Sequence, residues 1–411
     1  MRYVYTSQSA WILRSISSVK TLDDLDLKGK RVFMRVDFNV PMDKERHVRD
    51  DLRIRAVLPS LHKVLDSGGR LILASHMGRP KGKVADEFSL KPVAEHLSEL
   101  LAKPVPFVPD CVGPEVEKQV SLLNDGEALF LENLRFHPEE EKNDPEFSRR
   151  LAQLADIYVN EAFSASHRAH ASVEGITRFV PVCAAGYQLQ KEIQYFKKVM
   201  DNPQRPLAII VGGVKVSTKL GLLENLIPKI DYLIIGGAMA NTFFKAQGKE
   251  VGKSLVEDDY IETALRLLES AKKRGVKVFL PVDAVVSADE ESLGDVRQVS
   301  IDKVPKDTRI LDIGAQSVQV FESVLQSCKT IIWNGPMGVF ETPPFNKGTF
   351  ALAEFMGSLG ALTVIGGGDS AAAIRQANAE NKVSYVSTGG GAFLELLEGK
   401  DLPGVSALER C

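Results

Sequence analysis

Arginine and histidine side chains recur directly after short apolar runs in the first half of this 411-residue sequence. The pattern is visible in RVFMRVDFNVP, RLILASHMGRP and ALFLENLRF, where polar and basic residues follow each run. The candidates are Asp37, Asn39, His76, Arg79, Arg135, His167, Arg168 and His170. Because the planar guanidinium of arginine holds a carboxylate or phosphate with two hydrogen bonds, the pattern predicts a site for a small phosphorylated acid.

Some of these candidates allow a second interpretation. Asp37 has the chemistry of a general base, but an Asp next to an Asn in a loop also forms turns or binds hydroxyl groups, and we favour a binding role. His167 and His170 are three residues apart, as metal ligands often are, yet no third soft ligand lies near them in the sequence. We therefore expect no metal at that pair.

Glycines end the apolar runs of the second half, as in LAIIVGGVKVSTK and LTVIGGGDSAAA. Glycine lets backbone N–H groups approach a phosphate or a flat base, and the start of a following helix adds positive potential. Lys215 and Lys219 oppose the dipole of the helix predicted there, which indicates that they face an external anion. Asp369 either caps its helix or holds a nucleotide-bound Mg²⁺. The second half therefore predicts a nucleotide site.

Neither common nucleotide fingerprint is present. The segment QGKEVGKS, residues 247–254, resembles a P-loop, but only three residues separate Gly248 from Gly252 where four are required, and no strand directly precedes it. We predict a surface turn there. A GxGxxG motif with a downstream acid is also missing, which disfavours a nicotinamide enzyme.

The apolar runs predict two doubly wound parallel-sheet α/β domains. The runs are continuous rather than alternating, as in strands buried on both faces, and segments with helical periodicity separate them. The predicted strands cover 31–36, 70–75, 128–131, 156–159, 207–211, 232–236, 276–280, 330–333 and 362–366. In such sheets ligands bind beyond the carboxyl ends of the strands, which is where the candidate residues lie.

A chain of this length exceeds one hydrophobic core, so we expect two domains of about 200 residues each. The amphipathic segment 186–206, which exits through prolines, marks the boundary between them. The predicted parts are an N-terminal domain over 1–185, a hinge helix over 186–205 and a C-terminal domain over 206–392.

Composition excludes several classes of protein. The formal net charge is -3 and the isoelectric point is about 6.2, which disfavours bulk attraction to nucleic acid or to an anionic membrane. No apolar stretch approaches the ~20 residues that span a bilayer. The four cysteines lie far apart without CxxC spacing, so we expect neither a zinc site nor a disulfide framework, and a reducing cytoplasm. Residues 1–20 carry basic residues and no acid; we favour a surface tail over a targeting segment.

Taken together, RVDFNVP, SHMGRP, LENLRF, SHRAH, GGVKVSTK, WNGPMGVFE, GGGDS and STGGGAFLELLEGK resemble the motif series of the phosphoglycerate kinase family, in the family's order and from about residue 20 to the C-terminus. The resemblance implies reversible phosphoryl transfer between 1,3-bisphosphoglycerate and Mg-ADP, giving 3-phosphoglycerate and Mg-ATP, a step of glycolysis. It implies Mg²⁺ as cofactor, ATP or ADP as substrate, hinge closure, and a tail from about residue 393 that returns to the N-terminal domain. We expect a cytoplasmic monomer without nucleic-acid or membrane partners.

The resemblance also assigns site residues. The substrate-binding set in the N-terminal domain is Asp37, Phe38, Asn39, Arg53, His76, Met77, Gly78, Arg79, Arg135 and Arg168. The nucleotide-binding set in the C-terminal domain is Lys215, Lys219, Gly236, Gly237, Asn334, Glu341, Gly367, Gly368, Asp369 and Ser370. The catalytic set is Arg53, Lys215, Lys219, Gly366 and Gly367. Asp369 is implied to hold Mg²⁺ through the nucleotide.

The sequence departs from the family pattern at a few positions. Thr218 stands where the family often has Asp, and Ser370 replaces the commoner Thr but keeps the hydroxyl. Ile310 and Ala315 replace the glycine and proline of a frequent MGLDxGP pattern, so the sequence differs from the family at the expected base-side pocket.

The implied acceptor is a carboxylate, which is ionised near neutral pH, so no general base is needed. We hypothesise that Arg53 and Lys215 neutralise the transferring phosphoryl oxygens, that Lys219 follows the phosphate, and that the N–H groups at 366–368 bind the developing charge. Two alternatives stay open: a kinase of the same topology for a different small acid, and a non-catalytic nucleotide-binding or adhesion protein.

Overall fold

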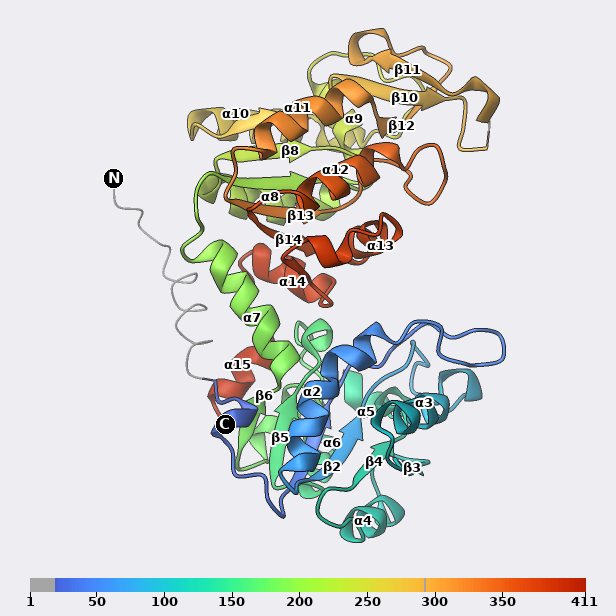
Figure 1. Cartoon of the computed structure of the whole chain (residues 1–411), viewed down its shortest axis with the longest axis vertical. Coiled ribbons are helices and arrows are strands. Elements are labelled where there is room, and N and C mark those ends of the chain that lie inside the picture. Colours follow the sequence, from blue (N-terminus) through green and yellow to red (C-terminus); the bar gives the residue numbers. More distant parts are fainter. Residues whose placement is uncertain (1–18, 292) are drawn as a thin grey trace. The chain divides into compact units, whose positions relative to one another are not determined.

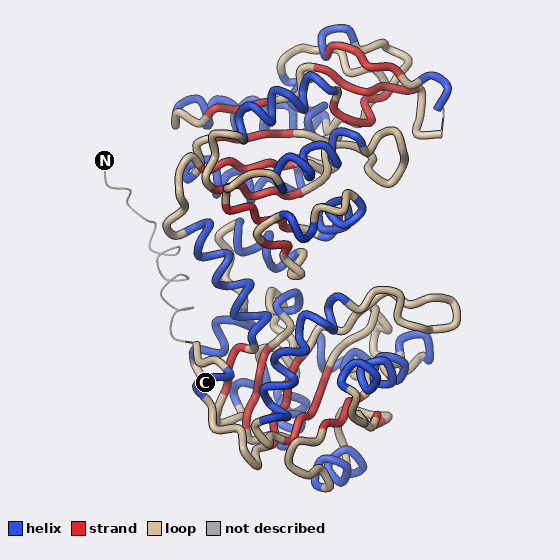
Figure 2. Tube along the Cα trace, in the orientation of Figure 1, coloured by secondary structure: helices blue, strands red, loops and turns tan. Residues whose placement is uncertain are grey.

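The computed structural model describes residues 19–291 and 293–411. The interpretation of residues 1–20 falls almost wholly outside this part of the chain. The chain divides into two compact units: unit 1 holds the described residues up to Gln194 together with Asp401–Cys411, and unit 2 holds Tyr195–Lys400. Each unit has its own parallel sheet, drawn as arrows in Figure 1 and as red tube in Figure 2. The predicted fold class, two parallel-sheet α/β domains, is confirmed.

In its described part, unit 1 contains a six-stranded sheet with the order β3-β4-β2-β1-β5-β6, and every pairing in it is parallel. Its strands are β1 (Arg31–Arg35), β2 (Arg70–Ala74), β3 (Phe107–Val108), β4 (Ala128–Leu131), β5 (Ile157–Asn160) and β6 (Cys183–Ala185). Its helices are α2 (Leu52–Asp66), α3 (Lys91–Leu101), α4 (Pro114–Ser121), α5 (Pro138–Glu141), α6 (Pro145–Gln153) and α15 (Pro403–Glu409). The connecting helix α7 (Tyr187–Met200) begins in this unit.

The apolar strands explain why this sheet forms. The core combines strand residues such as Val32 and Leu71 with one face of α2, including Ile54 and Leu61, and with one face of α3, including Leu97. Because helices connect consecutive parallel strands, the strands are buried on both faces and their sequences lack alternation. The chain order reverses direction between β1 and β5, so loops that leave these strands diverge there and open a crevice for a ligand.

Unit 2 repeats this plan with the strand order β15-β14-β13-β7-β8-β9, six parallel strands among the described residues. Its strands are β7 (Leu207–Val211), β8 (Tyr232–Ile235), β9 (Lys277–Phe279), β13 (Thr330–Asn334), β14 (Leu362–Gly366) and β15 (Tyr385–Val386). Its helices are α8 (Leu220–Leu226), α9 (Met239–Ala246), α10 (Ile261–Lys273), α11 (Ala315–Leu325), α12 (Lys347–Gly357), α13 (Gly368–Gln376) and α14 (Gly391–Leu397). Here the order reverses between β7 and β13.

A small antiparallel sheet in unit 2 was not predicted. It is formed by β10 (Asp283–Ser287), β11 (Arg297–Ser300) and β12 (Arg309–Ile313), in the order β11-β10-β12. The strand β11 is mostly exposed and polar, so it carries none of the apolar run that identified the other strands. Figure 1 shows these strands beside α9 and α11.

The C-terminal tail corrects the expectation about cysteines. The chain ends in α15, and Cys411 forms a disulfide with Cys183 of β6, with a Cα–Cα distance of 5.5 Å. The expectation of no disulfide was wrong because 228 positions separate the two cysteines in sequence while the returning tail places them side by side. Cys111 and Cys328 are free and buried. Arg410 adds an ion pair to Glu174 at 3.2 Å.

Candidate functional site

The basic residues of unit 1 meet at one edge of its sheet. Asp37 follows β1, His76 follows β2, Arg135 follows β4, and Arg168 lies in the loop after β5. The strands β4, β2, β1 and β5 are consecutive neighbours in the sheet and all run in the same direction. Their carboxyl ends therefore share one edge, and the side chains predicted from the sequence are brought together there.

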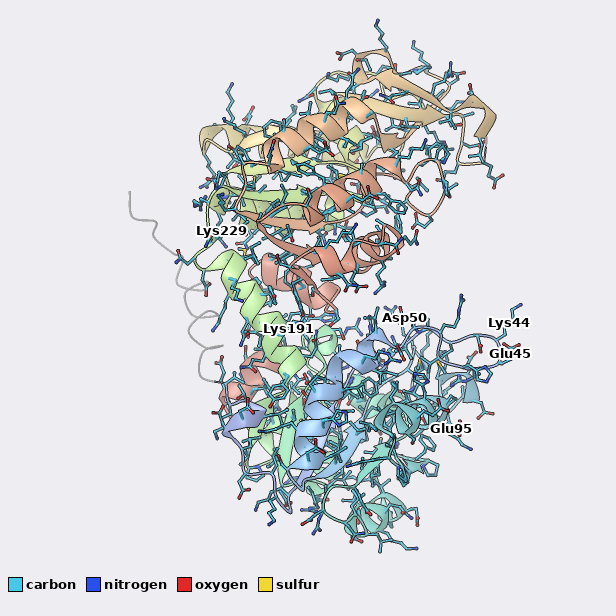
Figure 3. All side chains as sticks on the ribbon, viewed as in Figure 1. Lys44, Glu45, Asp50, Glu95, Lys191 and Lys229 are labelled. Atoms are coloured by element: carbon cyan, nitrogen blue, oxygen red, sulfur yellow. A yellow bond between two sulfur atoms is a disulfide. The ribbon has the colours of Figure 1, made fainter. Side chains whose placement is uncertain are left out.

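Asp37 and Arg53 form the first part of this cluster. Arg53 is the second residue of α2. Three positions before it, Asp50, labelled in Figure 3, accepts the N–H of Leu52 at 3.0 Å. Arg53 Nη1 donates to Asp37 Oδ2 at 2.8 Å and to the Asn39 carbonyl at 3.1 Å. The remaining guanidinium nitrogens of Arg53 make no hydrogen bond within the described residues, which leaves donors for a ligand.

Asn39 and Arg135 are joined through the backbone of Gly78, which forms the next part of the cluster. Asn39 Oδ1 accepts the N–H of Gly78 at 3.0 Å, and the Gly78 carbonyl accepts from Arg135 Nη1 at 2.8 Å. Gly78 has φ of +58°, and a Cβ there would collide with the ring of Phe88. Glycine is therefore required at position 78 both for its conformation and for its space.

The arginines make this edge strongly electropositive. Burial and then the charge of Arg35 lower the pKa of Arg135 to about 10, and its Nη2 is buried without a hydrogen-bond partner among the described residues. Burial, followed by the charges of Arg135 and Arg35, lowers the pKa of His170 to about 3. A bound anion relieves this repulsion and offers an acceptor to Arg135, because an unpaired buried donor is costly.

Asp37 and His76 lie close together, with 3.8 Å between Asp37 Oδ1 and His76 Nδ1. Burial opposes ionisation of Asp37, but the surrounding positive charge and the hydroxyl of Ser164 outweigh it, and the pKa of Asp37 is lowered. Burial is also the main reason why the pKa of His76 lies well below its ordinary value. Asp37 is thus a carboxylate and His76 a neutral imidazole, since Arg35 and Arg53 supply positive charge whatever the protonation of His76.

The other predicted substrate residues occupy different environments. Phe38 is buried against Phe130, with ring centroids 5.9 Å apart, and its N–H donates to Ser75 Oγ, so its side chain belongs to the core. Met77 is also buried, and its carbonyl accepts from Asn133. Arg79 is exposed and Arg168 is partly exposed, which leaves both guanidinium groups accessible to a ligand.

The residues of unit 2 that were predicted to bind the nucleotide also gather at strand ends. Lys219, in the 3₁₀ turn Ser217–Lys219 after β7, donates from Nζ to Asn334 Oδ1 at the end of β13. Asn334 Nδ2 in turn donates to the Gly366 carbonyl at the end of β14. Burial lowers the pKa of Lys219, while the charges of Asp369 and Glu398 act in the opposite direction. The three strands β7, β13 and β14 are adjacent, so this chain of bonds crosses the point where the strand order reverses.

The start of α13 is built for close approach to an anion. Gly367 has φ of +101°, and a Cβ there would lie 2.6 Å from Asn334 Nδ2. The hydroxyl of Ser370 accepts the N–H of Gly335 at 2.6 Å, which fixes the first turn of the helix beside β13. Gly368 and Asp369 are exposed, so backbone N–H groups at this helix start face solvent.

A cavity of about 260 Å³ adjoins these residues. It is lined by Gly237, Glu341 and Asp369 from the predicted set, and by apolar side chains that include Phe244 and Met337. Ile310 also lines the cavity, so this departure from the family pattern does fall on the pocket wall, whereas Ala315 begins α11 and is not among the lining residues. An apolar pocket beside a helix start suits a base attached to phosphates.

The remaining residues of the nucleotide set follow the strands β7 and β8. Gly236 and Gly237 follow β8, where a Cβ would collide with Met337 and with the backbone of Gly213. Lys215 is exposed in the loop after β7. The P-loop-like segment 247–254 follows α9 rather than a strand and forms turns, as predicted.

The sequence did not identify several residues that shape this edge of the unit 1 sheet. Asn133 ties the Arg135 turn to the carbonyls of Met77 and Phe88, and Ser164 donates to Asp37. Arg35 and Ser172 are buried and hydrogen-bonded to each other at 2.9 Å. Asn133 stands inside the LENLRF motif, which is a usable signal, but Arg35 and Ser172 carry no local signal of their role.

One cluster of possible metal ligands lies elsewhere in unit 1. Within the residues that the structure describes, it is the only such group of three, and it consists of Asp110, Cys111 and His137. Asp110 Oδ1 already accepts from His137 Nε2 at 2.7 Å and from the Cys111 N–H at 2.6 Å. Burial, and then the neighbouring carboxylates, raise the pKa of the Cys111 thiol, so we assign no ion to this group.

The fold and the two groups of residues are those of a two-domain α/β phosphotransferase: basic side chains gather at the carboxyl edge of one sheet, and glycines gather at that of the other. The phosphoglycerate kinase family model matches residues 22–400. A phosphoglycerate kinase of Syntrophobacter fumaroxidans is 70% identical over 393 residues, covering 96% of this chain and 99% of that protein. One of Chlorobium phaeovibrioides is 53% identical over 392 residues, covering 95% and 99%.

Solved structures agree. The structure of phosphoglycerate kinase from Coxiella burnetii matches with a TM-score of 0.87 at 40% identity, covering 95% of this chain and 99% of that one. The phosphoglycerate kinase from Pyrococcus horikoshii matches with a TM-score of 0.82 at 30% identity, covering 95% and 98%. The chain belongs to the phosphoglycerate kinase family. It is an enzyme that transfers a phosphoryl group reversibly between 1,3-bisphosphoglycerate and ADP, a step of glycolysis, and both alternatives left open by the sequence are set aside.

Proposed function

We propose that unit 1 binds the phosphorylated three-carbon acid and that unit 2 binds the nucleotide. The observation that carries this assignment is the electropositive edge of unit 1, where a buried Arg135 nitrogen lacks a partner and His170 is kept neutral. Unit 2 offers instead a helix start, a partly buried lysine and an apolar cavity. A small polyanion fits the first site, and a phosphate chain attached to a base fits the second.

The proposed chemistry needs positioning and charge neutralisation rather than a base. The carboxylate of 3-phosphoglycerate is ionised at neutral pH and attacks the terminal phosphorus of ATP directly and in line. We assign Arg53 and Lys215 to the transferring phosphoryl oxygens, and Lys219 to the phosphate as it moves. Backbone N–H groups of Gly366, Gly367 and Gly368 take the developing negative charge.

Mg²⁺ is proposed to arrive with the nucleotide. Asp369 is an exposed carboxylate in the first turn of α13, beside the phosphate-binding backbone. One carboxylate together with phosphate oxygens is a usual ligand set for Mg²⁺, which keeps its remaining waters. When bound, the ion neutralises charge on the phosphate oxygens, and Asp369 holds it in place.

We further propose that the reaction requires closure of the two units about α7 and the crossing near 388–393. Because the acid and the nucleotide are assigned to different units, their reacting atoms meet only if the units come together. Closure also excludes water, which would otherwise hydrolyse the acyl phosphate.

The proposed partners are small molecules only, and the enzyme is proposed to work as a monomer in the cytoplasm. No helix in the described part of the chain is long and apolar enough to cross a membrane. The nearly neutral net charge supports the absence of a nucleic-acid partner.

Two substitutions test the assignment of ligands to units. In calorimetric titrations, Arg168→Ala should weaken 3-phosphoglycerate binding at least about tenfold and leave Mg-ADP binding unchanged, because a charge-assisted hydrogen bond is worth about 1.5–3 kcal/mol. Asp369→Asn should weaken Mg-ADP binding and leave 3-phosphoglycerate binding unchanged. The opposite pattern, or loss of both affinities in both variants, would overturn the assignment.

A further inference from the structure

Arg35 is a wholly buried charge in the centre of unit 1. It is the last residue of β1, which lies between β2 and β5, and none of its surface is exposed. A buried guanidinium is expensive unless each nitrogen finds an acceptor. Arg35 meets this need through three groups: the Val36 carbonyl for Nη1, Ser172 Oγ for Nε at 2.9 Å, and His76 Nδ1 for Nη2 at 3.2 Å.

The contact with His76 fixes the position of the imidazole proton. Arginine has only donors, so a hydrogen bond from Nη2 requires that His76 Nδ1 be an acceptor without a proton. The competing arrangement would have Nδ1–H donate to Asp37, but Asp37 Oδ1 lies 3.8 Å away, too far for a hydrogen bond. Neutral His76 therefore carries its proton on Nε2.

The proton on Nε2 is available to a ligand. His76 Nε2 makes no hydrogen bond within the described residues, and the His76 side chain keeps 8% of its surface exposed. His76 follows β2 at the electropositive edge, beside Asp37 and the arginines. An N–H at this place donates to a carboxylate or phosphate oxygen, whereas an unprotonated Nε2 would repel it.

A second hydrogen bond of Arg35, to Ser172, lies at the end of the loop that carries Arg168 and His170. Ser172 accepts from Arg35 and donates its hydroxyl to Glu140 Oε1 at 2.6 Å, and its N–H donates to Glu140 Oε2 at 2.9 Å. Glu140 is itself fully buried in α5. The Glu140 carboxylate therefore balances the charge of Arg35 across the Ser172 hydroxyl. Through their bonds to Ser172, Arg35 and Glu140 together fix the end of the loop.

We propose that Arg35 is a positioning residue for the three-carbon substrate: it holds His76 as the Nε2–H donor and, through Ser172 and Glu140, holds the loop that presents Arg168. The proposal rests on the assignment of the substrate to unit 1. Arg35 does not touch the substrate, so its replacement changes substrate affinity through His76 and the loop.

The first test uses the unaltered protein without substrate. In ¹⁵N NMR spectra of protein with labelled histidine, assigned with His76→Gln, Nδ1 of His76 should give the signal of an unprotonated nitrogen and Nε2 that of a protonated one, at about pH 8, where even an unperturbed imidazole is neutral. A protonated Nδ1 would overturn the proposal. This result does not depend on substrate binding, so it is distinguishable from a failure of the proposed substrate site, which would appear as no 3-phosphoglycerate binding by the unaltered protein.

The second test separates the effect of Arg35 on His76 from its effect on the loop through Ser172. Arg35→Lys, which cannot make all three contacts, should abolish the single tautomer of His76 and raise the Kd for 3-phosphoglycerate at least about tenfold, with the Kd for Mg-ADP unchanged. Ser172→Ala should raise the Kd for 3-phosphoglycerate but keep the tautomer. Arg31→Lys is the matched control on the same strand, because Arg31 pairs with Asp156 away from these groups, and it should change neither measurement.

A double substitution shows whether Arg35 acts through His76. In the His76→Gln background, Arg35→Lys should raise the Kd for 3-phosphoglycerate by a smaller factor than in the unaltered protein. The effect of Arg35 through His76 is already lost there, and only its effect through Ser172 remains. Equal costs in both backgrounds, or an Arg35→Lys protein that keeps both tautomer and affinity, would refute the proposal. If Arg35→Lys does not fold, the NMR result on the unaltered protein and the affinity of Ser172→Ala decide the question.

Discussion

Glu161 is a buried carboxylate whose titration should control the stability of unit 1. It follows β5 and is almost completely inaccessible. Its oxygens accept the hydroxyl of Ser60 and the N–H groups of Gln188 and Leu189, at 3.2 and 2.9 Å, in the first turn of α7. Burial nevertheless dominates these hydrogen bonds and raises the pKa of Glu161 to about 7, from 4.5 in an exposed side chain.

The magnitude follows from the difference in proton binding. A shift from 4.5 to about 7 corresponds to about 3 kcal/mol, at 1.36 kcal/mol for each pH unit. The folded protein holds this proton more tightly than the unfolded chain. The contribution to stability is therefore fully present below about pH 4.5 and is lost as the pH rises through about 7.

Glu161→Gln removes the titration. The free energy of unfolding of the variant, minus that of the unaltered protein, should rise by about 3 kcal/mol between pH 4.5 and 8, whatever its constant offset. The titrations of groups that both proteins share cancel in this difference. They include His76 and His170, whose lowered pKa values make the free energy of unfolding rise with pH.

The assay must report on unit 1 alone, because a two-domain protein need not unfold in one step. Native-state hydrogen exchange in increasing urea, measured on peptides from β1 and β5, does so. Asp312→Asn is a matched control, since burial also raises the pKa of Asp312 to about 7 but in unit 2. It should leave the pH dependence of the unit 1 peptides unchanged. A difference between Glu161→Gln and the unaltered protein that stays constant with pH would refute the reasoning.

Three further outcomes are expected. Arg53→Ala should lower kcat about 100- to 1,000-fold while the Kd for Mg-ADP stays the same, because the variant loses one charged donor to the transition state. An unchanged kcat in a steady-state assay would refute the role of Arg53. Cys411→Ser should destabilise unit 1 by about 2–4 kcal/mol in urea unfolding, because the Cys183–Cys411 disulfide restricts the unfolded chain. A reductant should destabilise the unaltered protein by the same amount and leave the variant unchanged. Equal stability of the unaltered protein with and without reductant would contradict this. X-ray scattering should show compaction only when 3-phosphoglycerate and a Mg-nucleotide are both present, and the same radius of gyration under all conditions would count against closure.

The main strands of both sheets could be predicted because burial on two faces leaves a continuous apolar run. The runs at 128–131, 207–211 and 362–366 coincide with β4, β7 and β14. The short edge strands β3, β6 and β15 were missed, since two or three residues carry too little pattern. The small antiparallel sheet was missed because its exposed strand β11 is polar.

The candidate site was predictable where chemistry shows in residue type, and not where it depends on distant partners. Arginines and glycines after strands identified both edges, since parallel strands bring their carboxyl ends together. Arg35 stands inside an apolar run, and nothing local shows that it meets His76 and Ser172, which lie 41 and 137 positions away. The Cys183–Cys411 pair was invisible for the same reason.

The central claim is that this chain transfers a phosphoryl group to the carboxylate of 3-phosphoglycerate. The most direct measurement incubates the purified protein with 3-phosphoglycerate and Mg-ATP, traps the acyl phosphate with hydroxylamine, and follows ADP in a coupled assay. The account predicts equal amounts of trapped hydroxamate and ADP, with turnover in the usual enzymatic range of ~1 to 1,000 per second. ADP release without 3-phosphoglycerate, or ADP without hydroxamate, would contradict it.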